Sequence, residues 1–224
     1  MSLDLTLDAL FRALAGAPDP GWDLPGLEVH RATARGLGPL LADDVYPQTR
    51  AAVLARQGLP GWQRLLDRWL ARCPPTHPVP DDDAQSLPGF LAEDGAALGL
   101  PAWLVGLADL EACTRAVQRD EAPDPGADGP IQLHPTAILR VYPADLLGWL
   151  DGDDPAQDPA PGEHPVLLWR DAEDAAARMA LDPEVYDLIR GLARGAVPST
   201  EDARALLAEL VAVGAACGAC EQSL

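Results

Sequence analysis

The sequence predicts an α+β fold that is mostly α-helical. Before residue 121, apolar residues recur every three or four positions, which is the spacing of amphipathic helices. After residue 130, runs of β-branched and aromatic residues alternate with shorter helical stretches. We therefore predict a helical N-terminal domain over 1–122 and a winged-helix-like C-terminal domain with a small antiparallel sheet over 131–216. Residues 217–224 are expected to form a tail.

Amphipathic helices account for the whole N-terminal half of this prediction. Apolar spacing and the positions of proline and glycine set their limits. The helices are expected over 3–14, 25–46, 48–56, 60–72, 86–93 and 101–120. Trp62, Trp69 and Trp103 lie on the apolar faces of these helices and are expected in the core.

A linker rich in acidic residues, proline and glycine, "EAPDPGADGP" at 121–130, separates the two domains. The pattern that follows predicts a strand at 131–143, a short helix at 144–150, a loop at 151–163, a strand at 166–170, a turn at 171–174 and a strand at 176–181.

Two helices complete the C-terminal domain. Pro183 is expected to begin the first helix and Gly195 to terminate it. Ser199, followed by Asp202 three residues later, is expected to cap the second helix, whose apolar stripe runs from Leu206 to Val211. Two strands, a helix, a glycine turn and a helix occur in the order typical of a winged helix.

Charge excludes several classes of function. The chain has 35 Asp and Glu residues against 16 cations, a formal net charge of −19, and every cation is arginine. The absence of lysine excludes Schiff-base chemistry and a P-loop. Nucleic acid and anionic membrane surfaces are unfavourable partners because their binding depends on clustered cations. We find no secretory signal and no apolar run of transmembrane length, and expect a cytoplasmic protein.

No motif in the sequence indicates catalysis or a metal site. His77, His134 and His164 each precede proline, which favours extended loop or strand-edge positions over metal ligation. Cys217 and Cys220 have C-x-x-C spacing, but no second pair completes a zinc site. We expect two exposed thiols in a frayed tail. The chain is therefore expected to be non-catalytic and to hold no cofactor or metal.

Several blocks, in order and spacing, resemble a bacterial family described as DNA-binding domains. They are "GLEVHR", "VYP", "LPGFL", "LPAWLVGLADLEACTRAV", "LHPTAILRVYPADLLGWL" and "HPVLLWRDAEDAAARMALDPEVYDLIRGLARG". The family includes the partner proteins of multinuclear non-haem iron-dependent oxidases, such as the C-protein of methanobactin biosynthesis. The chain departs from it at 30–33, "HRAT", where many members have a Tyr-Arg-Asn-Asn-like run and only Arg31 is retained.

The resemblance implies a partner protein that binds the leader of a ribosomal precursor peptide and presents it to a TIM-barrel iron oxidase for post-translational modification. The iron is expected in that oxidase and not in this chain. Physically, an extended leader can add to an exposed strand edge while its side chains enter apolar pockets. The residues expected to bind the peptide are Ala177, Arg178, Met179, Leu181, Val185, Leu188, Ile189 and Leu192.

Two alternatives remain open from the sequence. The helix pair joined by a glycine turn is compatible with a DNA-binding transcriptional regulator, although Arg204 is the only cation in the second helix. Cys217 and Cys220 are compatible with a redox enzyme.

Overall fold

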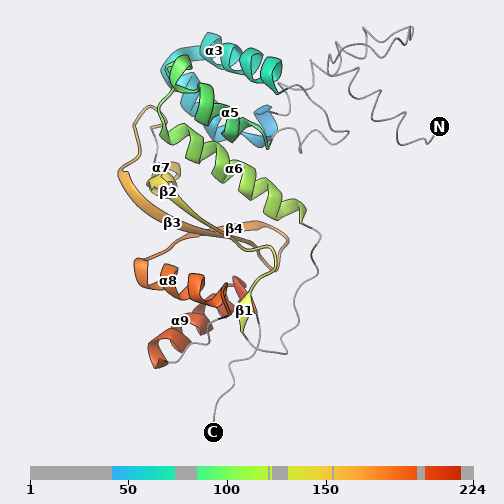
Figure 1. Cartoon of the computed structure of the whole chain (residues 1–224), viewed down its shortest axis with the longest axis vertical. Coiled ribbons are helices and arrows are strands. Elements are labelled where there is room, and N and C mark those ends of the chain that lie inside the picture. The colour runs from blue at the N-terminus through green and yellow to red at the C-terminus, as the bar shows by residue number, and fades with distance from the viewer. Residues whose placement is uncertain are drawn as a thin grey trace, which may run out of the picture. The chain divides into compact units, whose positions relative to one another are not determined.

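The computed structural model describes residues 42–73, 85–120, 122, 131–152, 154–195 and 200–217 (Figure 1). The fold is α+β and mostly α-helical, with small antiparallel sheets, as predicted. The chain packs as two compact units, one formed by residues 1–112 with 153–158 and the other by 113–152 with 159–224. The domain limits expected from the sequence stay a prediction.

Helices form the described part of the first unit: α3 (Pro47–Arg72), α5 (Leu87–Asp94), the 3-10 turn η1 (Ala96–Leu98) and the start of α6 (Trp103–Arg119). The helix expected over 3–14 and most of the one over 25–46 lie outside the described residues. The two helices expected at 48–56 and 60–72 are joined as α3, with a kink at Gly58 (φ 66°, ψ −174°). Glycine tolerates this left-handed φ, and Pro60 has no N–H to continue the helical ladder.

A buried carboxylate from α6 completes the start of α3. Glu111 accepts hydrogen bonds from the backbone N–H groups of Gln48 (2.6 Å) and Thr49 (3.0 Å) and from the Thr49 hydroxyl (2.7 Å). The first N–H groups of a helix lack partners within the helix, and a negative charge there is favourable. Glu111 therefore fixes α3 to α6. Trp62, Trp69 and Trp103 are buried, as predicted.

The second unit contains a three-stranded antiparallel sheet in the order β2 (Ile138–Ala144), β3 (Pro161–Arg170) and β4 (Ala176–Ala180). The single strand expected at 131–143 is wrong. The chain turns after His134, whose carbonyl accepts from Ala137 N–H (2.8 Å), and this turn separates β1 (Gln132–Leu133) from β2.

β3 begins at Pro161, earlier than the expected start at 166, because its first residues pair with the end of β2. The short helix α7 (Leu146–Leu150) follows β2, and the Asp145 side chain accepts from Gly148 N–H at its start. The helix matches the one predicted at 144–150. The start of β3 depends on pairing with β2, which local sequence signals do not reveal.

The C-terminal elements correct two expectations. β5 (Ala216–Cys217) pairs with β1, so Cys217 is buried in a strand and is not part of a frayed, exposed tail. Cys220 lies outside the described residues. Helix α9 (Glu201–Ala212) is capped by Thr200, whose hydroxyl accepts from Ala203 N–H (3.2 Å). Ser199, the expected cap, also lies outside the described residues.

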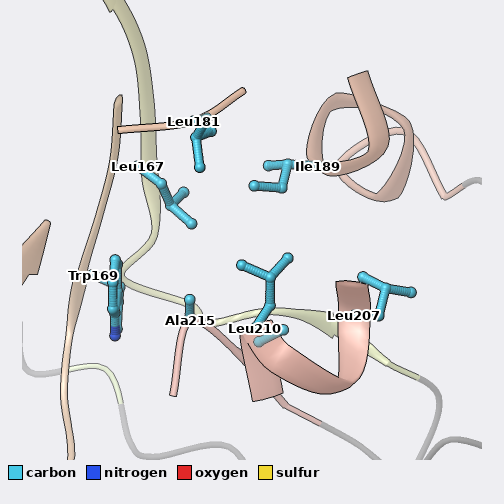
Figure 2. Close-up of a cluster of buried hydrophobic side chains, with 8 residues drawn as sticks. Leu167, Trp169, Leu181, Ile189, Leu207, Leu210 and Ala215 are labelled. Carbon is cyan, nitrogen blue, oxygen red and sulfur yellow. The ribbon is translucent and has the colours of Figure 1, made fainter. Parts of the chain in front are cut away.

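Helices α8 (Pro183–Leu192) and α9 cover one face of the three-stranded sheet (Figure 1). Figure 2 shows Leu167 and Trp169 of β3 with Ile189 of α8 and Leu210 of α9 in one buried cluster. The Trp169 indole N–H donates to the Val213 carbonyl (3.1 Å), which satisfies its polar edge in the core. This cluster holds the sheet and the two helices together.

Candidate peptide-binding edge of the sheet

Among the strands that the structure describes, β4 lies at an edge of the sheet and pairs with β3 alone. Leu181 N–H donates to the Pro165 carbonyl and Asp171 N–H to the Ala175 carbonyl, both at 2.9 Å. These bonds fix the register. Because hydrogen-bonded pairs alternate along an antiparallel ladder, the backbone groups of Ala177 and Met179 face β3.

The same alternation turns the N–H and C=O groups of Ala176, Arg178 and Ala180 away from β3. No hydrogen bond joins these six groups to any other residue that the structure describes. An unpaired row of this kind accepts an extended chain as a further strand. The described part of β4 therefore offers a site for strand addition.

The opposite edge of the sheet, at β2, is less open. Pro143 lacks an N–H, and the pairing of β2 with β3 shifts between Tyr142 and Ala144. The outward carbonyl of Leu139 accepts from the Arg140 guanidinium (3.4 Å). Proline and bulges prevent strand addition at sheet edges. β4 is thus the better edge for an added strand.

Side chains next to the open edge divide into core and surface. Leu181 and Ile189 are 7% and 0% exposed and belong to the buried cluster. The half-buried side chains packed against this cluster include five of the residues expected to bind peptide, namely Ala177, Met179, Val185, Leu188 and Leu192. Of the apolar residues in the expected set, these five keep part of their side chains accessible to a ligand. Arg178 is exposed and lies on the opposite face of β4 from Met179.

Tyr186 was missed in the sequence. It is half-buried against the same cluster, and the Arg190 guanidinium lies 6.0 Å from the centre of its ring. Tyr186 lies three residues before Ile189, which places both on one side of α8, and this spacing could have identified Tyr186 from the sequence.

Two hollows of about 330 and 260 Å³ lie in the helical unit. None of the expected peptide-binding residues lines them.

Charges near the helix pair are predominantly acidic. Glu201 and Asp202 occupy the first turn of α9, and Arg204 is the only cation of that helix. Carboxylates at this point repel the phosphates that a recognition helix must approach. This arrangement disfavours insertion of α9 into a DNA groove.

The alternative of a redox enzyme with Cys217 and Cys220 as its pair gains little support from the geometry around Cys217. Burial raises the pKa of the Cys217 thiol, which lowers the thiolate fraction that redox chemistry requires. His134 Nδ1 lies 2.8 Å from the Thr136 hydroxyl, and that hydroxyl accepts from Arg170 N–H (2.9 Å), so His134 helps to order the turn before β2. Within the described ranges, no three His, Cys, Asp or Glu side chains gather as a metal site.

No family model matches this chain, and no curated protein matches it. The family resemblance inferred from the sequence blocks therefore stays a prediction. Within the segments that the structure describes, no helix combines the length and apolar character needed to cross a membrane.

Proposed function

We propose that the chain is a non-catalytic recognition protein that binds the leader of a precursor peptide along β4 in a winged-helix-like domain. The outward N–H and C=O groups of Ala176, Arg178 and Ala180 carry this proposal. A leader bound as a fourth strand pairs with these groups. Its alternate side chains lie over Met179 and the accessible side of α8.

The number of available groups sets the scale of the affinity. Three residues with one donor and one acceptor each allow up to six backbone hydrogen bonds. At about 0.5–1.5 kcal/mol per bond, the gross gain is about 3–9 kcal/mol. Apolar contacts add to this gain, and ordering the peptide opposes it.

The partner that modifies the bound peptide is, in this proposal, a TIM-barrel multinuclear iron-dependent oxidase in the cytoplasm. The iron and the chemistry belong to that enzyme. This chain supplies the position of the peptide, and its acidic charge and buried Cys217 agree with a role in recognition.

Co-purification tests the proposal directly. The tagged chain is mixed at micromolar concentration with an iron oxidase encoded beside its gene and with the short cysteine-containing peptide from the same locus. We expect a ternary complex and modification of the peptide only when all three components are present. Absence of the complex, or equal modification without this chain, contradicts the proposal.

Two parallel measurements address the alternatives. A salt-dependent gel shift of duplex DNA would support a transcriptional regulator. For a redox enzyme, replacing Cys217 and Cys220 by serine is preferable to truncation, because deletion from Cys217 onward also removes half of β5. Peptide delivery that survives the double serine replacement excludes the redox role.

A further inference from the structure

Helix α3 has an unusual charge for this chain. It carries five arginines and one aspartate, a formal charge of +4, within a protein whose net charge is −19. Three of the arginines are neutralised by acidic partners: Arg50 by Asp43, Arg56 by Asp158, and Arg72 by Glu93 and Asp94. The two others, Arg64 and Arg68, form no ion pair with any described residue.

Arg64 and Arg68 lie one helical turn apart and are both exposed. Residues four apart share a face of a helix, so Arg64 and Arg68 lie on the same side of α3. With Asp67, Ala97 and Leu98 they line a hollow of about 330 Å³. The hollow thus combines two cations and one anion with a small apolar wall from η1.

The rim of this hollow is held in place by hydrogen bonds. Gln57 donates from its side-chain amide to the carbonyls of Leu98 (3.0 Å) and Gly99 (3.1 Å). Its oxygen accepts from Arg64 Nη2 (3.2 Å). A Cβ at Gly61 would lie 2.3 Å from the Gln57 Cβ, so glycine leaves the space that Gln57 occupies. One guanidinium is therefore oriented by the kinked part of α3.

We propose that Arg64 and Arg68 form a docking site for an acidic segment of a partner polypeptide. Guanidinium groups match carboxylates in geometry and charge. The apolar residue beside each carboxylate packs against Ala97 and Leu98. A polyanion is disfavoured because the rest of the chain is strongly acidic, and screening limits the attraction of α3 to about 10 Å. A short acidic segment senses mainly the local pair.

The probe is an acetylated, amidated pentapeptide of alternating glutamate and leucine, and its matched control has glutamine in place of glutamate. Binding is followed by NMR of the arginine Nε–Hε groups in the full chain at low salt. We expect the acidic peptide to bind more tightly than the control and to shift the Arg64 and Arg68 signals. In the absence of a site, the acidic protein repels the acidic peptide and the neutral control binds at least as well.

Variants assign the effect to the two arginines. Replacing both Arg64 and Arg68 by alanine is expected to raise the dissociation constant of the acidic peptide roughly fivefold or more. Each exposed ion pair contributes only modestly to binding, but both are lost in this variant. Alanine has a high helix propensity, so the double variant is expected to fold, and circular dichroism tests whether its helical content matches that of the wild type. Arg204→Ala, an exposed arginine of α9, is the matched control and is expected to leave binding unchanged.

Three outcomes overturn the proposal. They are equal binding of the glutamate and glutamine peptides, wild-type affinity in the folded double variant, and no binding of the acidic peptide at millimolar concentration. Arg64→Lys combined with Arg68→Lys keeps the charge without the guanidinium fork and is expected to retain part of the binding.

Discussion

Replacing Arg178 with proline tests the open edge of β4 with a single change. The N–H of Arg178 points away from β3, so its removal leaves the β3–β4 ladder through Ala177 and Met179 intact. Proline is tolerated on sheet edges, and it favours an extended conformation in the preceding residue, which Ala177 already has as part of β4. We expect the Arg178→Pro chain to fold, with a loss of stability of about 1 kcal/mol.

Peptide binding is expected to suffer much more than stability. One backbone hydrogen bond at the centre of the added strand is lost, worth about 0.5–1.5 kcal/mol, and the carbonyl opposite it is left unpaired at a cost of about 1–3 kcal/mol. Together these amount to about 1.5–4.5 kcal/mol. The dissociation constant should rise roughly tenfold to roughly two-thousandfold.

Isothermal titration with the precursor peptide provides the assay, and Arg178→Ala provides the control. Alanine keeps the N–H and removes only the exposed side chain, so its affinity should stay within about threefold of the wild type. Wild-type affinity in a folded Arg178→Pro chain would refute the reasoning. Equal losses in the two variants would place the effect in the side chain and not in the strand edge.

Three substitutions and one labelling measurement test the fold around these sites. Ile189→Ala removes a fully buried side chain and should reduce the free energy of unfolding by about 2–4 kcal/mol in urea, whereas a loss below about 1 kcal/mol contradicts its core position. Glu111→Ala leaves the start of α3 without its acceptor and should cost about 2–4 kcal/mol, measured by thermal melting; an unchanged melting temperature would be inconsistent with the cap. Cys217 should react with iodoacetamide more slowly in the native chain than in urea, by roughly tenfold or more, because Cys217 is buried and burial raises the pKa of its thiol. Equal rates in the two conditions would instead support an exposed C-terminal tail. Hydrogen bonds from Arg56 and Trp103 lower the pKa of Asp158 from its ordinary value of 3.8. The ionised Asp158 carboxylate therefore stabilises the folded chain above that value, and this contribution to the free energy of unfolding is lost as pH falls through the lowered pKa. The difference in melting temperature between the wild type and Asp158→Asn should therefore be larger at neutral pH than in strong acid, and a constant difference would contradict this.

Elements with strong local signals were predictable. The proline at the start of α8 and the alternating strand before it predicted Pro183–Leu192 and β4 within one or two residues. The same pattern identified the apolar side of α8 but not which residues α9 covers. That is why Leu181 and Ile189 were grouped with the accessible Met179, although they are buried in the core.

Features that depend on distant partners were not predictable from local patterns. Cys217 pairs with Gln132, 85 residues earlier in the chain, so nothing near the C-terminus indicated β5. The arginines of α3 are visible in the sequence, but only the fold shows that Arg64 and Arg68 lack acidic partners among the described residues. Pairing of distant segments decides these cases, because tertiary contacts override local preference.

Amide hydrogen exchange in the presence and absence of the precursor peptide tests strand addition at β4 most directly. In the free chain, the outward amides of Arg178 and Ala180 should exchange quickly, whereas those of Ala177 and Met179 are already bonded to β3 and should exchange slowly. Peptide binding is predicted to slow the outward amides and to leave the inward ones nearly unchanged. Protection confined to α9, or no change at Arg178 and Ala180 under saturating peptide, would contradict the account.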